Sequence, residues 1–200
     1  MKSVLISIQP KWCELIASGK KTVEVRKTKP KLETPFKVYI YCTKNKEKLI
    51  EVIHEGDEVY GFIHKGKPNF IKTVGENWTI YGVFKGGKVI GEFVCDTFII
   101  DKTFGHDALF NAAACLSDAD AASYCLNKEM YGWHISDLVI YDKPKELEDF
   151  YVLKKCNSCR DTGYESTACC YDEDCRVPAV ITRPPQSWCY CEEGEKKNDL

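Results

Sequence analysis

Four charged side chains occur in the stretch GKKTVEVR, residues 19–26, and three of them, Lys21, Glu24 and Arg26, surround one tight turn and the strand that follows it. A lysine ammonium such as that of Lys21 offers three hydrogen-bond donors to a phosphate or a carbonyl. The guanidinium fork of Arg26 fits a phosphate or a base edge, and the carboxylate of Glu24 can accept from an exocyclic amine or a ribose hydroxyl. Together these groups can hold one nucleotide. The alternative interpretation is a structural ion pair on a sheet surface.

The same groups could also move protons. Lys21 can act as a base if burial and the nearby Arg26 lower its pKa, and Glu24 can then handle a proton. A nucleophilic role for Cys13, which precedes this stretch, finds no obvious histidine partner in the sequence. The sequence therefore leaves open whether the chain is an enzyme, and Lys21 and Glu24 are the catalytic candidates if it is one.

Twelve cysteines form a second feature with chemical potential. Five of them are scattered, mostly among apolar residues, where reduced cysteines behave as small core side chains. These five are Cys13, Cys42, Cys95, Cys115 and Cys125. The other seven lie between residues 156 and 191, where the hydrophobic periodicity of the chain disappears over 154–176.

Cys156 and Cys159 form a C-x2-C pair, which suits two corners of a tetrahedral zinc site. Cys170 and Cys175 are our choice for the second pair, with Cys169 as a substitute for Cys170. A structural Zn²⁺ ion would fold a segment that has no hydrophobic core of its own. Free thiols or disulfides are the alternatives, and Cys189 or Cys191 could contribute a ligand.

The elements that would position the charged residues follow from periodicity. Residues 4–8 read as a buried strand, and 10–18 as a short helix that Gly19 can end. Residues 22–26 alternate, so that Val23 and Val25 face the core while Glu24 and Arg26 share the opposite face. Residues 37–42 form a further strand with Tyr39 and Tyr41 on one face.

The rest of the chain predicts several more strands and a helical block, without a regular alternation of strand and helix. The glycine-rich stretch 85–88 is predicted to be a hairpin turn that feeds one long strand. The other expected elements are strands at 57–63, 78–84, 89–100, 135–142 and within 179–193, and helices at 107–116 and 118–127. This pattern favours an α+β fold with a mostly antiparallel, barrel-like sheet.

Charge is distributed unevenly along the chain. Residues 1–50 sum to +8, residues 51–141 to −6 and residues 142–200 to −4. A basic first quarter indicates one positive face, as expected for a polyanionic partner, although lysine-rich turns can simply be solvated. The apolar runs are too short for a signal peptide or a membrane span, so a cytoplasmic protein is expected.

The stretch 19–26 matches the pattern G-x-K-x-x-E-x-R and resembles the signature of the ASCH domain family of the PUA-like superfamily. The flanking stretches VLISIQPKWCELIASGKKTVEVRK, VYIYCTK and YGWHISDLVIYDKPKELEDF agree with it. The chain is similar to bacterial and phage ASCH proteins with a Cys-rich insert. The resemblance implies a small β-barrel with flanking helices, and a cleft at the motif that binds RNA or a modified nucleotide.

The resemblance also implies an alternative function, since some small family members hydrolyse acylated cytidines and some are reported ribonucleases. Those amidohydrolases use the motif lysine with a threonine three residues later, whereas this chain has Glu24 there. Trp12 and Tyr41 are expected to stack on bases beside Lys21, Glu24 and Arg26, with Tyr39 and Trp188 as further candidates. The expected organisation is an ASCH domain at 1–150 plus 179–193, a Cys-rich insert at 151–178 and a disordered tail at 194–200.

Overall fold

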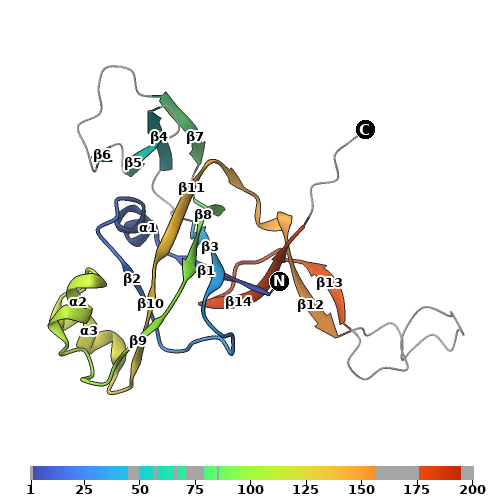
Figure 1. The fold of residues 1–200 in the computed structure, drawn as a ribbon. Coiled ribbons are helices and arrows are strands. Elements are labelled where there is room, and N and C mark those ends of the chain that lie inside the picture. Colours follow the sequence, from blue (N-terminus) through green and yellow to red (C-terminus); the bar gives the residue numbers. More distant parts are fainter. Residues whose placement is uncertain are drawn as a thin grey trace, which may run out of the picture.

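The computed structural model describes residues 2–44, 50–55, 58–64, 67–70, 79–84, 86–155 and 176–194. Its largest layer is a sheet with the strand order β11-β8-β3-β1-β14-β12-β13 (Figure 1). The strands are β11 (Ser136–Lys145), β8 (Lys88–Cys95), β3 (Phe36–Cys42), β1 (Ser3–Ile8), β14 (Trp188–Glu193), β12 (Phe150–Lys155) and β13 (Arg176–Val180). Only β1 and β3 pair in parallel within this sheet.

Two smaller sheets complete the described strands. One has the order β2-β10-β9 and the other the order β6-β5-β4-β7. Their strands are β2 (Val23–Arg26), β10 (Met130–His134), β9 (Phe98–Asp101), β6 (Lys67–Phe70), β5 (Glu58–His64), β4 (Ile50–Glu55) and β7 (Thr79–Phe84). The α+β class and the mostly antiparallel pairing are therefore confirmed, but among the described strands the sheets do not close into a barrel.

The helices are short, and their ends follow from local chemistry. They are α1 (Pro10–Ala17), α2 (Ala108–Ala113), α3 (Asp118–Cys125) and the single-turn 3₁₀ helix η1 (Leu147–Asp149). Pro10 occupies the first turn of α1, where its missing N–H has no effect on the helix. Ser117 caps α3 by accepting a hydrogen bond from the Asp120 N–H.

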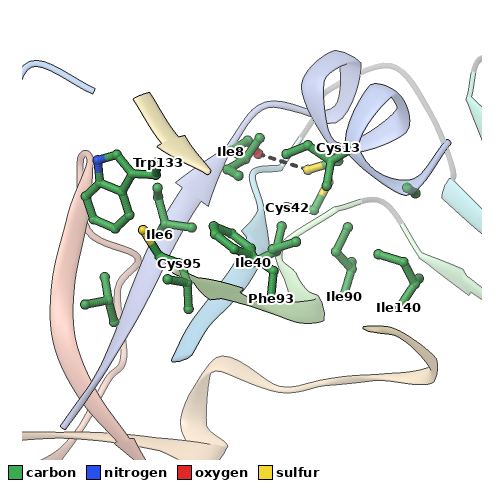
Figure 2. Packing of buried hydrophobic residues seen from close by; sticks show 14 of the residues in the cluster. Ile6, Ile8, Cys13, Ile40, Cys42, Ile90, Phe93, Cys95, Trp133 and Ile140 are labelled. Atoms are coloured by element: carbon green, nitrogen blue, oxygen red, sulfur yellow. Dashed lines mark hydrogen bonds between the residues drawn. The ribbon is translucent and has the colours of Figure 1, made fainter. Parts of the chain in front are cut away.

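The alternation in β3 divides the core between the two faces of the large sheet. Val38, Ile40 and Cys42 pack in one cluster with residues of α1 and with the fully buried Trp133. Figure 2 shows this cluster, in which Cys13 of α1 lies beside Cys42. Tyr39 and Tyr41 face the other way into a second cluster. The period-two prediction for this strand is thus confirmed.

Two predictions about the middle of the chain are wrong. Gly86 and Gly87 have φ values of 71° and 85°, as a tight turn requires, but β7 and β8 belong to different sheets and form no hairpin. The predicted single strand 89–100 is broken at Asp96 and Thr97 into β8 and β9, which also lie in different sheets. The apolar sequence runs through this break, but only β8 is mostly buried, since Ile99 and Ile100 of β9 are exposed.

Some predictions fall where the structure gives no test. Cys156, Cys159, Cys169, Cys170 and Cys175 lie outside the described residues, as does most of the predicted tail. Among the described residues, no group of three or more His, Cys, Asp or Glu side chains is arranged to hold a metal ion. None of the described helices is long and apolar enough to cross a bilayer. The predicted division into domain, insert and tail stays a prediction.

Candidate functional site

The motif lysine is placed by the end of α1. Gly19 adopts a φ of 69°, a conformation that side-chain-bearing residues rarely accept, and so turns the chain out of the helix. The Lys21 N–H then donates to the Leu15 carbonyl at 2.9 Å. The Lys21 side chain is only 3% exposed, and its Nζ donates to the carbonyl of Ala114 at 2.7 Å. The chain just after α2 therefore fixes the direction of this ammonium.

Glu24 and Arg26 are placed by the alternation of β2. Val23 and Val25 pack against α2 and α3, which leaves Glu24 and Arg26 on the opposite face. Glu24 Oε1 lies 3.0 Å from the guanidinium of Arg26, and Glu24 Oε2 lies 3.5 Å from Lys21 Nζ. The motif thus forms one buried cluster in which a single carboxylate faces two cations.

The cluster borders a cavity of about 640 Å³. The other lining residues come from the ends of β1 and β3, from β2, from α1, from α3 and its preceding turn, and from the segment before β14. They are Ser7, Ile8, Gln9, Lys11, Trp12, Val25, Thr43, Leu116, Asp120, Tyr124, Pro184, Pro185 and Gln186. The volume is within the roughly 300–1,000 Å³ of small-molecule pockets.

Burial changes the protonation chemistry of the cluster. Desolvation lowers the pKa of Lys21, because the low-dielectric surroundings disfavour the charged ammonium, while the neighbouring Glu24 acts in the opposite direction. A lysine with a lowered pKa can give up its proton closer to neutral pH. The site therefore contains a basic group whose proton affinity is tuned by its position.

Arg26 has binding capacity that the protein does not use. Its guanidinium donates to the Ser7 carbonyl at 2.6 Å and pairs with Glu24, but its Nε is buried without a hydrogen-bond partner. Buried donors are normally satisfied, so an unpartnered one beside a cavity indicates a position where a ligand acceptor would be stabilised.

Two aromatic rings line the cavity. Trp12 lies under two ammonium groups, with Lys11 Nζ at 4.5 Å and Lys21 Nζ at 5.0 Å from its ring centroid. Tyr124 of α3 is the second ring, and its side chain is 36% exposed. Such rings offer faces on which a base can stack.

The predicted site residues separate into two groups. Lys21, Glu24, Arg26 and Trp12 meet at the cavity. Tyr41 does not lie there: it is 2% exposed in the second core cluster, on the other face of the large sheet. Cys13 is 1% exposed, and burial raises the pKa of its thiol well above the usual range, which gives no support to a nucleophilic role.

Sequence reasoning missed Tyr124, Asp120 and the Ala114 carbonyl. The Ala114 carbonyl meets Lys21 across 93 positions of sequence, and no local pattern reports such a contact. The sequence placed Asp120 and Tyr124 only within a predicted helix at 118–127. The tertiary arrangement of α3 beside β2 is what brings both to the cavity.

Comparison with known proteins supports this resemblance. Residues 6–92 match the family model of the ASCH domain, which confirms the resemblance drawn from the motif over this part of the chain. A search of curated proteins found no match.

Solved structures of similar shape are ASCH proteins from Zymomonas mobilis. The crystal structure of one gives a TM-score of 0.47 at 15% sequence identity, covering 94% of this chain and 86% of that chain. A tyrosine-to-phenylalanine mutant of the Zymomonas protein gives a TM-score of 0.48 at 15% identity, covering 95% and 90%.

Proposed function

We propose that the cavity at the motif binds RNA or a modified nucleotide. The observation that carries this proposal is the convergence of Lys21, Glu24 and Arg26 on one wall of a cavity that Trp12 and Tyr124 also line. The unpartnered Arg26 Nε and the Lys21 ammonium supply donors for phosphate or base oxygens, and the rings supply stacking. RNA binding is also the activity with which ASCH domains are associated.

A calorimetric titration tests this proposal with cytidine monophosphate and a single-stranded RNA oligonucleotide as probes. Lys21→Met removes the buried ammonium but keeps an apolar stem of similar length, and should weaken binding at least tenfold, the equivalent of about 1.4 kcal/mol. Lys20→Met is the matched control, because Lys20 is the adjacent lysine, and its side chain is exposed and does not line the cavity. Equal affinities of the two variants and the unaltered protein would contradict the proposal.

A hydrolase is the second candidate, favoured by the lowered pKa of Lys21. In that reaction a water adds to the carbonyl carbon of an acylated cytidine. Neutral Lys21 takes the proton of the water, and the C–N bond breaks as that proton passes to the leaving nitrogen. Glu24, 3.5 Å from Lys21, would hold the ammonium that forms in between. A nuclease using the same groups is the other version of this candidate.

Product analysis separates binding from hydrolysis. The protein is incubated with N4-acetylcytidine and with single-stranded RNA, and release of acetate or of shortened RNA is followed beside binding. Turnover that disappears in Lys21→Met and persists in Lys20→Met would establish an enzyme. Binding without turnover in the unaltered protein would leave the binding function and remove the hydrolase.

We also propose a structural zinc site formed by Cys156, Cys159, Cys170 and Cys175. Four thiolates are a common donor set for structural Zn²⁺. Metal analysis of the purified protein should give one zinc per chain. Cys156→Ser should lower that ratio, whereas Cys115→Ser, which alters a thiol that donates to the Lys20 carbonyl, should not. Protein purified without chelators that contains no zinc would refute this site.

A further inference from the structure

A short basic segment leaves the mouth of the cavity directly after Arg26. This segment, residues 27–31 with the sequence KTKPK, is called the basic arm below. Lys27, Lys29 and Lys31 are exposed, and no acidic residue interrupts them. Because Arg26 itself lines the cavity, the arm begins at the cavity's rim. Three positive charges therefore continue outward from a site already rich in cations.

The backbone of the basic arm is anchored. Trp188 Nε1 donates to the Thr28 hydroxyl at 3.0 Å, and the Lys31 N–H donates to the Tyr190 hydroxyl at 2.8 Å. Pro30 is buried between these two anchors. In Figure 1 the chain runs from β2 past β14 before it enters β3. The arm is thus held along β14 while its alternate lysines remain exposed.

Two of the three ammonium groups of the arm lie over aromatic rings. Lys27 Nζ is 4.9 Å from the ring centroid of Tyr124, which also lines the cavity. Lys29 Nζ is 5.1 Å from the centroid of Phe98 and 5.8 Å from that of Tyr131. Such contacts at exposed sites contribute only about 0.5–1 kcal/mol, so phosphates can draw the lysines away at little cost and free the rings for bases.

We propose that the ligand of the cavity is a nucleotide within single-stranded RNA, and that the strand continues along the basic arm with its phosphates near Lys27, Lys29 and Lys31. This inference rests on the proposed nucleotide binding. A free nucleotide would be held by the cavity alone and would not use the arm. A strand gains three further phosphate contacts and rings spaced along its path, which is the arrangement found in single-strand binding surfaces.

Fluorescence anisotropy with a labelled mixed-sequence RNA of about ten nucleotides tests the inference. Lys27, Lys29 and Lys31 are changed together to Ala; all three side chains are exposed, so the fold should persist. Each phosphate contact to a single strand contributes about 0.7 to the slope of log affinity against log salt, so the triple variant should reduce that slope by about 2. Its affinity at low salt should fall roughly tenfold or more.

Three controls make the result specific. Changing Lys143, Lys154 and Lys155 to Ala removes the same charge from exposed positions outside the arm, and should leave the slope unchanged. Changing the three arm lysines to Arg keeps the charge and should retain both slope and affinity. Binding of cytidine monophosphate should be unaltered in the Ala variant of the arm, because the arm lies outside the cavity.

The outcomes distinguish this inference from the proposed function. If the monophosphate binds but the RNA binds no more tightly, the strand path is wrong and the cavity's function stands. If neither probe binds, both are wrong. An equal loss of slope in the two triple-Ala variants, or equal affinity for a duplex of the same length, would also overturn the inference. The expected result is that only the arm variant loses affinity and salt dependence, and that it does so for single-stranded RNA but not for cytidine monophosphate.

Discussion

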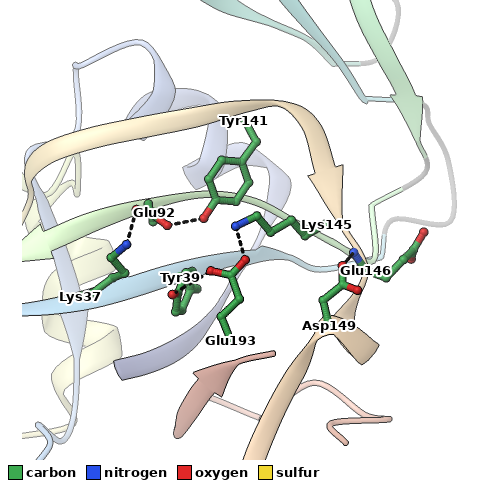
Figure 3. Close-up of polar contacts among 8 residues, drawn as sticks. All are labelled: Lys37, Tyr39, Glu92, Tyr141, Lys145, Glu146, Asp149 and Glu193. Carbon is green, nitrogen blue, oxygen red and sulfur yellow. Dashed lines mark hydrogen bonds and ion pairs between the residues drawn. The ribbon is translucent and has the colours of Figure 1, made fainter. Parts of the chain in front are cut away.

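Two clusters of charged and polar side chains on opposite sides of the large sheet invite comparison. The first is the motif cluster of Lys21, Glu24 and Arg26. The second, called the bridging cluster here, joins four strands of the large sheet (Figure 3). It consists of Lys37, Tyr39, Glu92, Tyr141, Lys145 and Glu193. Both contain carboxylates between cations, so residue type alone does not separate them.

The difference lies in what each cluster leaves unsatisfied. In the bridging cluster Lys37 and Tyr141 both donate to Glu92, and Tyr39 and Lys145 both donate to Glu193. These contacts link β3, β8, β11 and β14, and the polar side chains of the cluster serve as hydrogen-bond partners for one another. The motif cluster instead leaves Arg26 Nε without a partner and borders the 640 Å³ cavity. An unpartnered hydrogen-bond donor beside a cavity indicates a binding site. Side chains that satisfy one another's hydrogen bonds indicate a structural role, and the bridging cluster is a structural brace in this sense.

The clusters also differ in solvent access. Lys21 and Glu24 are 3% and 6% exposed at their side chains, whereas Lys37 and Glu92 are 43% and 19% exposed. Charge pairs near solvent are screened, and each partner can be rehydrated when the other is lost. A deeply buried charge cannot be rehydrated in this way when its partner is lost. The same substitution should therefore have unequal effects in the two places.

The largest expected effect follows from this contrast. Glu24→Gln leaves the ammonium of Lys21 and the guanidinium of Arg26 buried together without a counter-charge, and should lower the free energy of unfolding by about 3–5 kcal/mol. Glu92→Gln should lower it by only about 1 kcal/mol. Urea unfolding of both variants measures the difference. Equal losses would mean that burial does not separate the clusters.

The next effect concerns ligand affinity. Arg26→Lys keeps the positive charge but removes the guanidinium fork and its unpartnered Nε. It should weaken RNA binding about tenfold, since a hydrogen bond to a charged group contributes about 1.5–3 kcal/mol. Lys37→Ala, in the bridging cluster, should leave the affinity unchanged. Titrations with the same RNA decide, and a loss in both variants would erase the distinction between site and brace.

A smaller effect tests the bridging cluster alone. Tyr141→Phe removes the hydroxyl that donates to Glu92 and should lower the free energy of unfolding by about 1 kcal/mol. RNA affinity should not change, because Tyr141 does not line the cavity. Reduced RNA affinity at unchanged stability would assign this tyrosine to binding.

The local part of the site was accessible to sequence reasoning. Period-two alternation predicted that Glu24 and Arg26 lie on the face opposite Val23 and Val25. Gly19 predicted the end of the helix, and so the turn that carries Lys21. The structure confirms both predictions. Hydrophobic alternation is a local property, so β1, β2 and β3 could be predicted with their faces. The same reasoning could not tell that the charged face is buried, because that depends on what packs over it.

The parts that failed depend on long-range pairing. A continuous apolar run from 89 to 100 cannot reveal that β8 pairs with β3 while β9 pairs with β10. Tyr41 was expected at the site because aromatic rings suit base stacking, yet strand alternation sends it to the face of Tyr39. Tyr124 carried no local signal, and only the packing of α3 against β2 brings it to the cavity.

The last prediction concerns pH, where stability should rise with pH for both clusters, but in different pH windows and for different reasons: Lys21 loses a charge that burial penalises, and Glu92 gains a charge that its neighbours stabilise. Burial lowers the pKa of Lys21 in the folded protein, so the unfolded chain binds more protons below its own pKa of about 10.4. The contribution of Lys21 to the free energy of unfolding must therefore rise with pH between its lowered pKa in the folded protein and its pKa in the unfolded chain. Burial raises the pKa of Glu92, but hydrogen bonds from Lys37 and Tyr141 outweigh it and lower that pKa overall. Its contribution is present above about pH 4.3 and is lost as pH falls through the folded value.

Matched variants isolate the pH window of each group. As pH rises from 7 toward 10, the unfolding free energy of the unaltered protein should increase relative to that of Lys21→Met. The reason is that deprotonation of Lys21 removes a charge that is costly to bury. The advantage of the unaltered protein over Glu92→Gln should shrink as pH falls below about 4.3, which is the same direction in a lower pH window, because protonation removes the carboxylate that Lys37 and Tyr141 stabilise. A Lys21 difference that stays flat with pH would mean that the motif ammonium is solvated like a surface lysine. The two clusters would then differ in their neighbours but not in their electrostatics.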